Sequence, residues 1–309
     1  ATPVTVNAVD YAFNIITSAP AHQVSLTTNN PNATISAPVT LTGGTASFNA
    51  TFYTYSPTTT TYYTVTANDD TDNTVAANTS SNIMVMAGAF TKLLMVMPRE
   101  TYAPGTPTGK TGTATAPIIN VAYTVNVYGV DQYWNRVSSS TNTVAISATG
   151  VTNFTPPAAA ALSTTGPRAF NLVFKTLAET PNVTATNTTD GTKTAYTQLL
   201  PAVTVGPFVK LQILFPGETA LPNTVSGKTG TPNSQNAGVP FNVTVNAVDA
   251  NWNLITTVTD EVAITNALAA DAATSVLPAN ANLVAGTGTF SVTLRRAATN
   301  HQLVASNVT

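Results

Sequence analysis

Apolar and polar residues alternate with a period of two along many short segments of the chain. In the segment 241–248, Phe241, Val243 and Val245 fall on one face, and the Asn and Thr residues between them fall on the other. This is the period of a β-strand with one buried face. Val and Thr favour the pleated surface of a sheet, and clusters of Gly, Pro, Asn and Asp separate the segments. No stretch of a dozen residues shows a helical period, so the pattern predicts an all-β protein.

The strand pattern is repeated three times. The segments 4–14, 123–135 and 241–253 each contain the motif V-D-x-x-[FW]-N. Its aspartates are separated by 121 and 118 residues: Asp10, Asp131 and Asp249. A phenylalanine later in each unit keeps a similar spacing: Phe48, Phe170 and Phe290. A period of about one domain length indicates tandem domains, each with its own core, rather than a solenoid of short repeats.

A second pair of matching segments marks where the units begin. Residues 92–112 and 210–230 both start with K-L and end with G-K-T-G. We therefore expect three domains, comprising residues 1–89, 90–207 and 208–309. About seven short strands in a unit of this length is the pattern of a two-sheet β-sandwich.

The order of motifs in a unit resembles that of bacterial immunoglobulin-like repeats. A K-L strand is followed by Pro, by the alternating strand ending in V-D-x-x-[FW]-N, by V-A-I, and by G-x-x-x-F. The resemblance covers essentially the whole chain and implies three tandem immunoglobulin-like sandwiches of a surface or extracellular protein. It implies little about function, because such modules serve adhesins, fibres, surface layers and enzyme spacers alike.

The ends of the sequence are out of phase with these units. The first unit has no K-L strand, and the third stops before any counterpart of residues 82–88 or 202–207. We therefore expect the first sandwich to lack its first strand and the last to lack its final strand, which exposes sheet edges and core. Two explanations stay open: further repeats flank this segment, or a neighbouring subunit donates the missing strand. Head-to-tail contacts that do not close would build an open fibre.

The amino-acid composition of the chain excludes several classes of function. Only 8% of the 309 residues are charged, against about 25% in ordinary domains. With 11 Lys and Arg residues and a net charge of −2, the chain has no basic face for nucleic acid. It has no Cys for disulfides or thiolate metal sites, and no apolar run long enough to span a membrane. This composition suits an exported prokaryotic surface protein.

Few residues offer catalytic chemistry. His22 and His301 lie in different units and match no repeated Ser or Asp partner, so neither a triad nor a zinc site is expected. Glu100 and Glu218 occur one per domain, too far apart for paired-carboxylate catalysis. The G-K-T-G segments lack the frame of a phosphate-binding loop and are interpreted as turns whose Gly residues supply positive φ. We expect no enzyme, no catalytic residue and no cofactor.

Two motifs could bind ligands. The V-D-x-x-[FW]-N motif could hold a metal or a sugar, but we interpret it as a turn in which Asp accepts backbone N–H groups and Asn tolerates positive φ. The segment N-D-D-T-D-N (68–73) places Asp69, Asp70 and Asp72 in one turn, and carboxylates at this density suit Ca²⁺. These three are the predicted calcium ligands; a solvated turn is the alternative.

The leading hypothesis is a structural subunit, or a repeat segment, of an extracellular filament or surface layer. Short linkers without Gly/Ser tracts predict stiff coupling between the domains. Assembly would use β-edges, a donated strand or apolar contacts, with copies of the chain or flanking repeats as partners. The alternatives are an adhesin stalk or carbohydrate-binding module that uses Trp134 or Trp252, and a spacer in a secreted enzyme.

Overall fold

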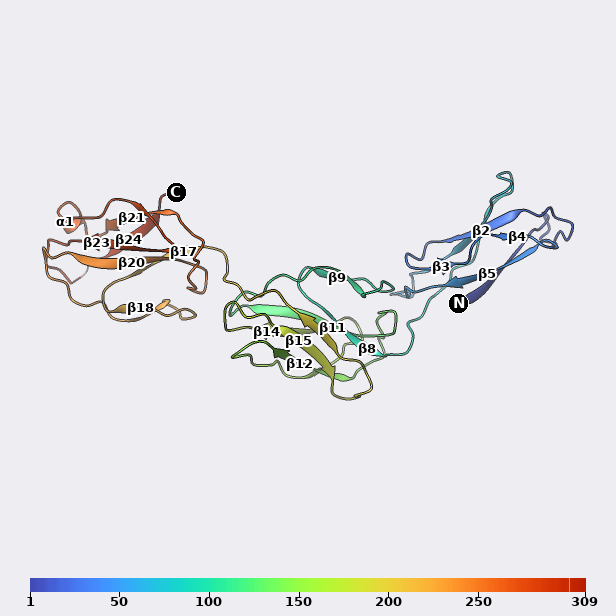
Figure 1. Ribbon diagram of the computed structural model, residues 1–309, viewed down its shortest axis with the longest axis horizontal. Coiled ribbons are helices and arrows are strands. Elements are labelled where there is room, and N and C mark those ends of the chain that lie inside the picture. Colours follow the sequence, from blue (N-terminus) through green and yellow to red (C-terminus); the bar gives the residue numbers. More distant parts are fainter. Residues whose placement is uncertain (300) are drawn as a thin grey trace.

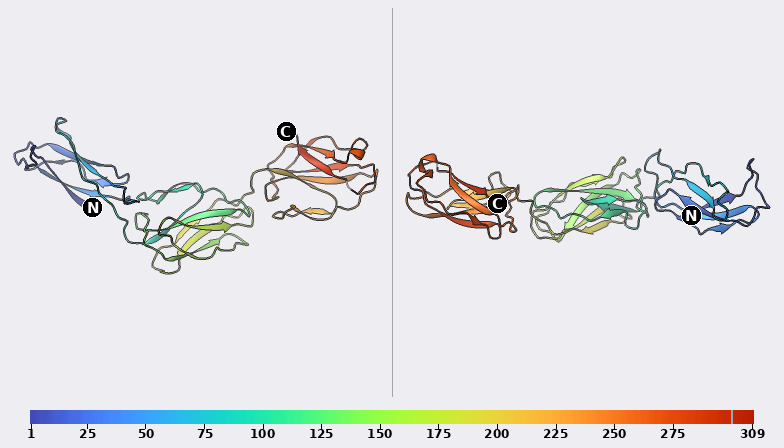
Figure 2. Two further views of the ribbon diagram at one scale, coloured as in Figure 1. Left: turned by 180° about the vertical axis from the view of Figure 1, so that it is seen from behind. Right: turned by 90° about the horizontal axis from the view of Figure 1, so that it is seen from above.

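The computed structural model describes residues 1–299 and 301–309, and it arranges them as three β-sandwiches in a row (Figure 1 and Figure 2). Three hydrophobic cores form around Phe48, Phe170 and Phe290. Each core draws its residues from within one of the three predicted ranges, called domains 1, 2 and 3 below. The prediction of an all-β chain of tandem immunoglobulin-like sandwiches is confirmed.

Domain 2 is the most complete of the three. Its first sheet has the order β14 (Arg168–Val173), β11 (Ala122–Val130), β8 (Lys92–Val96). Its second sheet has the order β13 (Ala160–Ala161), β12 (Thr143–Thr149), β15 (Asn182–Asn187), β16 (Tyr196–Leu199). A hairpin of β9 (Glu100–Tyr102) and β10 (Lys110–Gly112) follows β8. All pairs are antiparallel, and the core lies between the two sheets.

Domain 1 has the same plan but lacks a counterpart of β8 in the described part of the chain. Its sheets have the orders β1 (Thr2–Asn7), β5 (Thr45–Thr51), β3 (Thr34–Ile35) and β4 (Val39–Thr40), β2 (Gln23–Thr28), β6 (Val65–Asp69), β7 (Asn78–Thr79). Strand β1 corresponds to β11, because both carry the alternating pattern before the motif aspartate. One edge of β1 pairs with β5, and the other is open.

Domain 3 differs from domain 2 in its second sheet. Its sheets have the orders β17 (Lys210–Leu214), β20 (Phe241–Val248), β23 (Thr287–Val292) and β22 (Ala281–Asn282), β21 (Glu261–Asn266), β24 (Leu303–Asn307). A hairpin of β18 (Glu218–Ala220) and β19 (Lys228–Gly230) follows β17. The described residues provide no counterpart of β16, so the outer edge of β24 is open. Neither β8 in domain 1 nor β16 in domain 3 has a counterpart among the described residues.

The register of the strands explains why the same residues are buried in each domain. Phe170 lies opposite Val125, and Phe290 lies opposite Val243, so each ring projects into its core beside the alternating strand of its domain. Phe48 takes the same position in domain 1. The three rings are 2% to 4% exposed.

One local prediction was wrong, and one short element was not predicted. The G-K-T-G segments are not simple turns, because Lys110–Gly112 and Lys228–Gly230 are strands; Gly109 and Gly227, with φ of 74° and 73°, make the turns before them. Domain 3 also contains a one-turn helix, α1 (Ala269–Ala272), in an Ala-rich stretch without alternation. One turn is too short to leave a periodic signal in the sequence.

Candidate functional site: the open edge of domain 1

The repeated V-D-x-x-[FW]-N motif builds the same turn in every domain. In domain 2, Asp131 Oδ1 accepts the backbone N–H groups of Tyr133 and Asn135 at 2.8 and 2.9 Å. The Asn135 side-chain amide returns to the carboxylate, with Nδ2 at 3.0 Å from Oδ2. The same bonds join Asp10 to Asn14 and Asp249 to Asn253. These contacts support the turn interpretation, with one correction that concerns the aromatic residue.

The aromatic residue of the motif, rather than the asparagine, takes the left-handed conformation. The φ angles of Phe13, Trp134 and Trp252 are 63°, 68° and 66°. Such angles cost about 1–2 kcal/mol for an L-residue. Packing of the ring offsets this cost in domains 2 and 3, because Lys92 Nζ lies 3.3 Å from the centre of the Trp134 ring and Lys210 Nζ lies 3.4 Å from that of Trp252.

The glycine before each K-T-G strand lies against the indole ring of its own domain. A Cβ atom on Gly109 would lie 2.5 Å from Trp134 Cγ, and one on Gly227 would lie 2.2 Å from Trp252 Cδ2. Both indoles are therefore held between the first strand and the hairpin of their own domain. The carbohydrate-binding alternative, which relies on stacking of a sugar on Trp134 or Trp252, gains no support from this packing.

The motif carboxylate also holds the preceding linker. Asp131 Oδ2 accepts the N–H of Gly88 at 2.8 Å, and Asp249 Oδ2 accepts that of Gly206 at 3.0 Å. Burial alone would raise the pKa of Asp249, but the bonds from Asn253, Gly206 and the turn outweigh it and lower that pKa. Each linker therefore ends on the turn of the next domain.

The junction between domains 1 and 2 has further contacts. Asn135 Nδ2 donates to the carbonyl of Tyr53, and Asn135 Oδ1 accepts the N–H of Tyr55, both at 2.9 Å. Asn32 Nδ2 donates to the carbonyl of Pro104 at 3.2 Å. The rings of Tyr53 and Tyr133 pack edge to face at 4.9 Å. These contacts agree with the stiff coupling that the short linker predicts.

The open edge of β1 lies where the other two domains hold their first strand. In domain 2, β8 pairs with residues 126–130 of β11, and in domain 3, β17 pairs with residues 244–248 of β20. Aligned on the motif aspartates, the corresponding segment of domain 1 is 5–9. The backbone groups of this segment that face away from β5 are positioned to pair with an added antiparallel strand.

An apolar groove of about 560 Å³ runs beside this edge, between the two sheets of domain 1. Val4, Val6 and Ala8 line one wall; Leu26 and Val65 line the other. Phe13 also borders the groove and is 78% exposed, whereas the corresponding Trp134 is half-buried under Lys92. The groove therefore opens onto residues of the domain 1 core.

The predicted calcium ligands are in one turn, but their side chains have separate partners. Asp69 Oδ2 lies 2.6 Å from His22 Nδ1, Asp70 Oδ1 accepts from Ser25 Oγ, and Asp72 Oδ1 accepts from Thr74. Within the described residues, no group of three or more His, Cys, Asp or Glu side chains could hold a metal ion. Each carboxylate is thus held by a different partner, and the calcium site stays a prediction.

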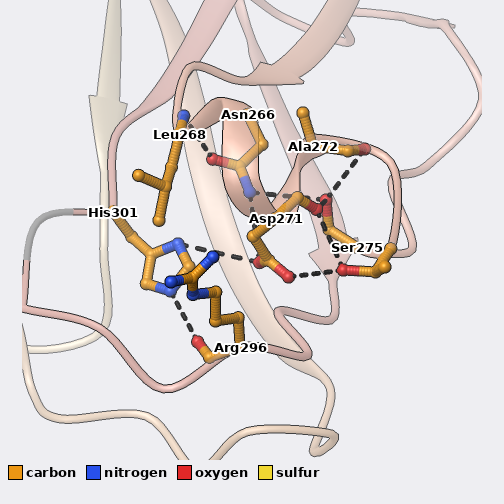
Figure 3. A network of polar contacts seen from close by, with 8 residues as sticks. Asn266, Leu268, Asp271, Ala272, Ser275, Arg296 and His301 are labelled. Atoms are coloured by element: carbon orange, nitrogen blue, oxygen red, sulfur yellow. Dashed lines mark hydrogen bonds and ion pairs between the residues drawn. The ribbon is translucent and has the colours of Figure 1, made fainter.

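A buried polar cluster near α1 is the other candidate for chemistry (Figure 3). Asp271 is fully buried and accepts bonds from Thr274 and Asn266. His301 Nδ1 is 3.7 Å from Asp271 Oδ2, and Ser275 Oγ donates to the backbone carbonyl of Asp271 rather than to the imidazole. The arrangement fixes a loop and lacks the Ser–His contact that a triad requires.

The strand order defines the class of the protein, a chain of immunoglobulin-like sandwiches. No protein-family model and no curated protein matches the chain. Among solved structures, the chain is similar to the Escherichia coli adhesin FdeC, with 16% identity over 99% of this chain and 87% of that one and a TM-score of 0.37. It is also similar to the FN1–FN3 domains of chicken CNTN1, with 8% identity over 93% and 90% of the two chains and a TM-score of 0.30.

A third similarity, to a Parabacteroides merdae β-glucuronidase, has 8% identity and a TM-score of 0.23. It covers 70% of this chain and 24% of the glucuronidase chain. At such identities only the fold is compared, and the fold is already given by the pairing of the strands. No helix among the described residues is long and apolar enough to cross a membrane.

Proposed function

We propose that this chain is a non-enzymatic structural subunit of an extracellular filament or surface layer, and that domain 1 accepts a β-strand from a neighbouring copy. One observation carries the proposal. Domain 1 presents an open edge and an apolar groove where domains 2 and 3 hold β8 and β17.

Domains 2 and 3, in which β8 and β17 occupy this position, indicate which residues the incoming strand should carry. It runs antiparallel to β1 and pairs with the segment 5–9. It carries Lys at the position of Lys92 and Lys210, so that its ammonium covers the exposed face of Phe13. Apolar side chains follow, as in β8, where Leu93, Leu94, Met95 and Val96 are all buried.

A neighbouring copy is the proposed partner because the described residues of domains 1 and 3 leave different sheet edges open. Domain 1 opens the edge of β1, and domain 3 opens the edge of β24, in the other sheet of the sandwich. Contacts between unlike surfaces continue from copy to copy without closing, and so build a filament. The low charge and the hydrogen-bonded junctions suit such an assembly, since neighbours meet without strong repulsion.

The experiment uses the chain and a synthetic peptide with the sequence of residues 208–215, which include β17. We expect the peptide to bind domain 1 and raise the midpoint of its thermal transition, and the chain alone to form fibres visible by negative stain as concentration rises. Excess peptide should shorten these fibres, because it occupies the same groove. A scrambled peptide is the control.

Two outcomes contradict the proposal. If the peptide binds but the chain stays monomeric at all concentrations, the groove takes a strand from its own polypeptide and the subunit does not polymerise through it. If the peptide does not bind, the groove is not a strand acceptor. A stalk of an adhesin would then be the better hypothesis, and a glycan array with the intact chain would test it.

A further inference from the structure

A lysine, a glutamate and a glutamine form a closed cluster in domain 2. Lys110 and Glu100 lie on the two strands of the β9–β10 hairpin, with Lys110 Nζ at 2.7 Å from Glu100 Oε2. Their side chains are only 11% and 4% exposed. Gln198 reaches them from β16, an edge strand of the opposite sheet. The cluster therefore joins elements that are far apart in the sequence.

The glutamine amide lies directly against the lysine amine. Lys110 Nζ is 2.5 Å from Gln198 Oε1. Because a C=O bond is about 1.2 Å long, the amide carbon is less than about 4 Å from the same nitrogen. This is close to the separation from which a positioned nucleophile attacks.

Glu100 touches both groups that would exchange a proton. Its Oε2 faces the amine, and its Oε1 accepts the Gln198 Nε2–H bond at 2.6 Å. The backbone N–H of Met97 holds the carboxylate in place at 2.9 Å. One carboxylate thus bridges the nucleophile and the leaving group of an acyl transfer.

We propose that Lys110 and Gln198 form an intramolecular amide cross-link, with Glu100 as its catalytic base and acid. Glu100 takes a proton from the Lys110 ammonium, which leaves a neutral amine. The amine attacks the Gln198 amide carbon, and the C–N bond to the side-chain NH₂ breaks after Glu100 returns the proton to that nitrogen. The attacking nitrogen passes its remaining extra proton through Glu100 to the released ammonia. The products are a secondary amide between the two side chains and one ammonium ion, with no oxidant or cofactor needed.

The surroundings of the cluster favour this step. The Tyr196 ring lies 5.0 Å from Lys110 Nζ and shields it from water. An open depression of about 430 Å³ borders Glu100 and Gln198 and gives the ammonia a way out.

Domain 3 provides an internal control. Lys228 and Glu218 repeat the ion pair at 2.7 Å on the β18–β19 hairpin. Domain 3 has no described counterpart of β16, so no glutamine reaches this pair, and the Lys228 side chain is 32% exposed. The reaction is therefore expected once in the chain, in domain 2.

The test is the intact mass of the purified, folded chain, followed by trypsin digestion and peptide mass spectrometry. We expect a mass lower than that of the sequence by one ammonia, no cleavage after Lys110, and a peptide in which Lys110 is joined to Gln198. Glu100→Gln and Lys110→Arg should each restore the full mass, while Lys228→Arg should leave the deficit unchanged. Circular dichroism confirms that each variant is folded.

A full intact mass with normal cleavage after Lys110 would overturn the proposal, and the cluster would then be a hydrogen-bonded ion pair only. A deficit that persists in Lys110→Arg would also overturn it, because the lost ammonia would come from another residue. The proposal does not depend on filament assembly, since the cross-link lies within one domain and is measured on the isolated chain.

Discussion

Domains 1 and 2 carry the same turn motif, but its residues have different surroundings. Asp131 is 3% exposed, and Trp134 is covered by Lys92. In domain 1, Asp10 makes the same bonds to Asn14, yet Phe13 is 78% exposed. The difference follows from β8. This strand supplies Lys92, and it follows the linker whose Gly88 N–H group bonds to Asp131. The motif specifies the turn, and the first strand buries it.

The largest expected effect comes from the core phenylalanines. Phe170→Ala and Phe290→Ala should each lower the free energy of unfolding by about 3–5 kcal/mol, because a large cavity forms in a closed core. Phe48→Ala should cost about 2–3 kcal/mol, since the open core of domain 1 can relax around the gap. Fluorescence of Trp134 and Trp252 reports unfolding of domains 2 and 3, and calorimetry reports that of domain 1. A loss below about 1 kcal/mol at Phe170 would contradict its inward position.

The next largest loss of stability is expected at Gly109, which packs against the indole of Trp134. Gly109→Ala should destabilise domain 2 by about 2–4 kcal/mol, because the new Cβ strains a positive φ and collides with Trp134. Gly43→Ala in domain 1 is the matched control: its φ is also positive, at 57°, but nothing lies within 4 Å of the new atom. It should cost about 1 kcal/mol. Equal losses in urea unfolding would show that the indole does not pack on Gly109.

A smaller difference in the free energy of unfolding is expected between variants of the motif aspartates Asp131 and Asp10. Asp131→Ala leaves the buried N–H group of Asn135 and the part-buried N–H group of Gly88 without their acceptor, and should cost about 1–3 kcal/mol. Asp10→Ala removes bonds from a turn that water can reach, and should cost about 0.5 kcal/mol. Denaturant unfolding of the two variants measures the difference. Similar losses would mean that the first strand does not bury the turn.

The smallest effect is a dependence on pH. Hydrogen bonds lower the pKa of Asp249 in the folded state, against the effect of its burial. Its contribution to stability is therefore complete above the unfolded pKa, near about 4, and is lost as pH falls through the lower folded pKa. The free energy of unfolding of domain 3 should be flat between about pH 5 and 7 and fall below pH 4. Asp249→Asn should reduce this slope; an unchanged slope would assign it to other carboxylates.

Much of the fold could be predicted from the sequence because its determinants are local and repeated. The alternation around Phe241 specifies a strand with one buried face, and the matching spacings of Asp131 and Asp249 specify the tandem units. The missing edge strands were also predictable, since the K-L segment is absent before the first motif. The helix α1 was not, because four residues carry no period.

The site contacts were harder to predict because they depend on pairs distant in the sequence. Asn135 belongs to the motif, yet its bonds to Tyr53 and Tyr55 of domain 1 cannot be inferred from a turn. Gln198 occurs in one unit only, so the repeat does not single it out. The calcium prediction rests on the carboxylates of the segment 68–73 and stays a prediction. Local sequence does not tell that Asp69 and Asp70 make contacts with His22 and Ser25.

The bond from Gly88 to Asp131 has a consequence for cutting the chain into pieces. The carboxylate that closes the turn of domain 2 also anchors the last residues of domain 1, and Gly206 repeats this arrangement one domain later. A single sandwich expressed from its first strand onward would leave that carboxylate one partner short. Each autonomous folding unit therefore begins a few residues upstream of its own first strand, inside the tail of the sandwich before it.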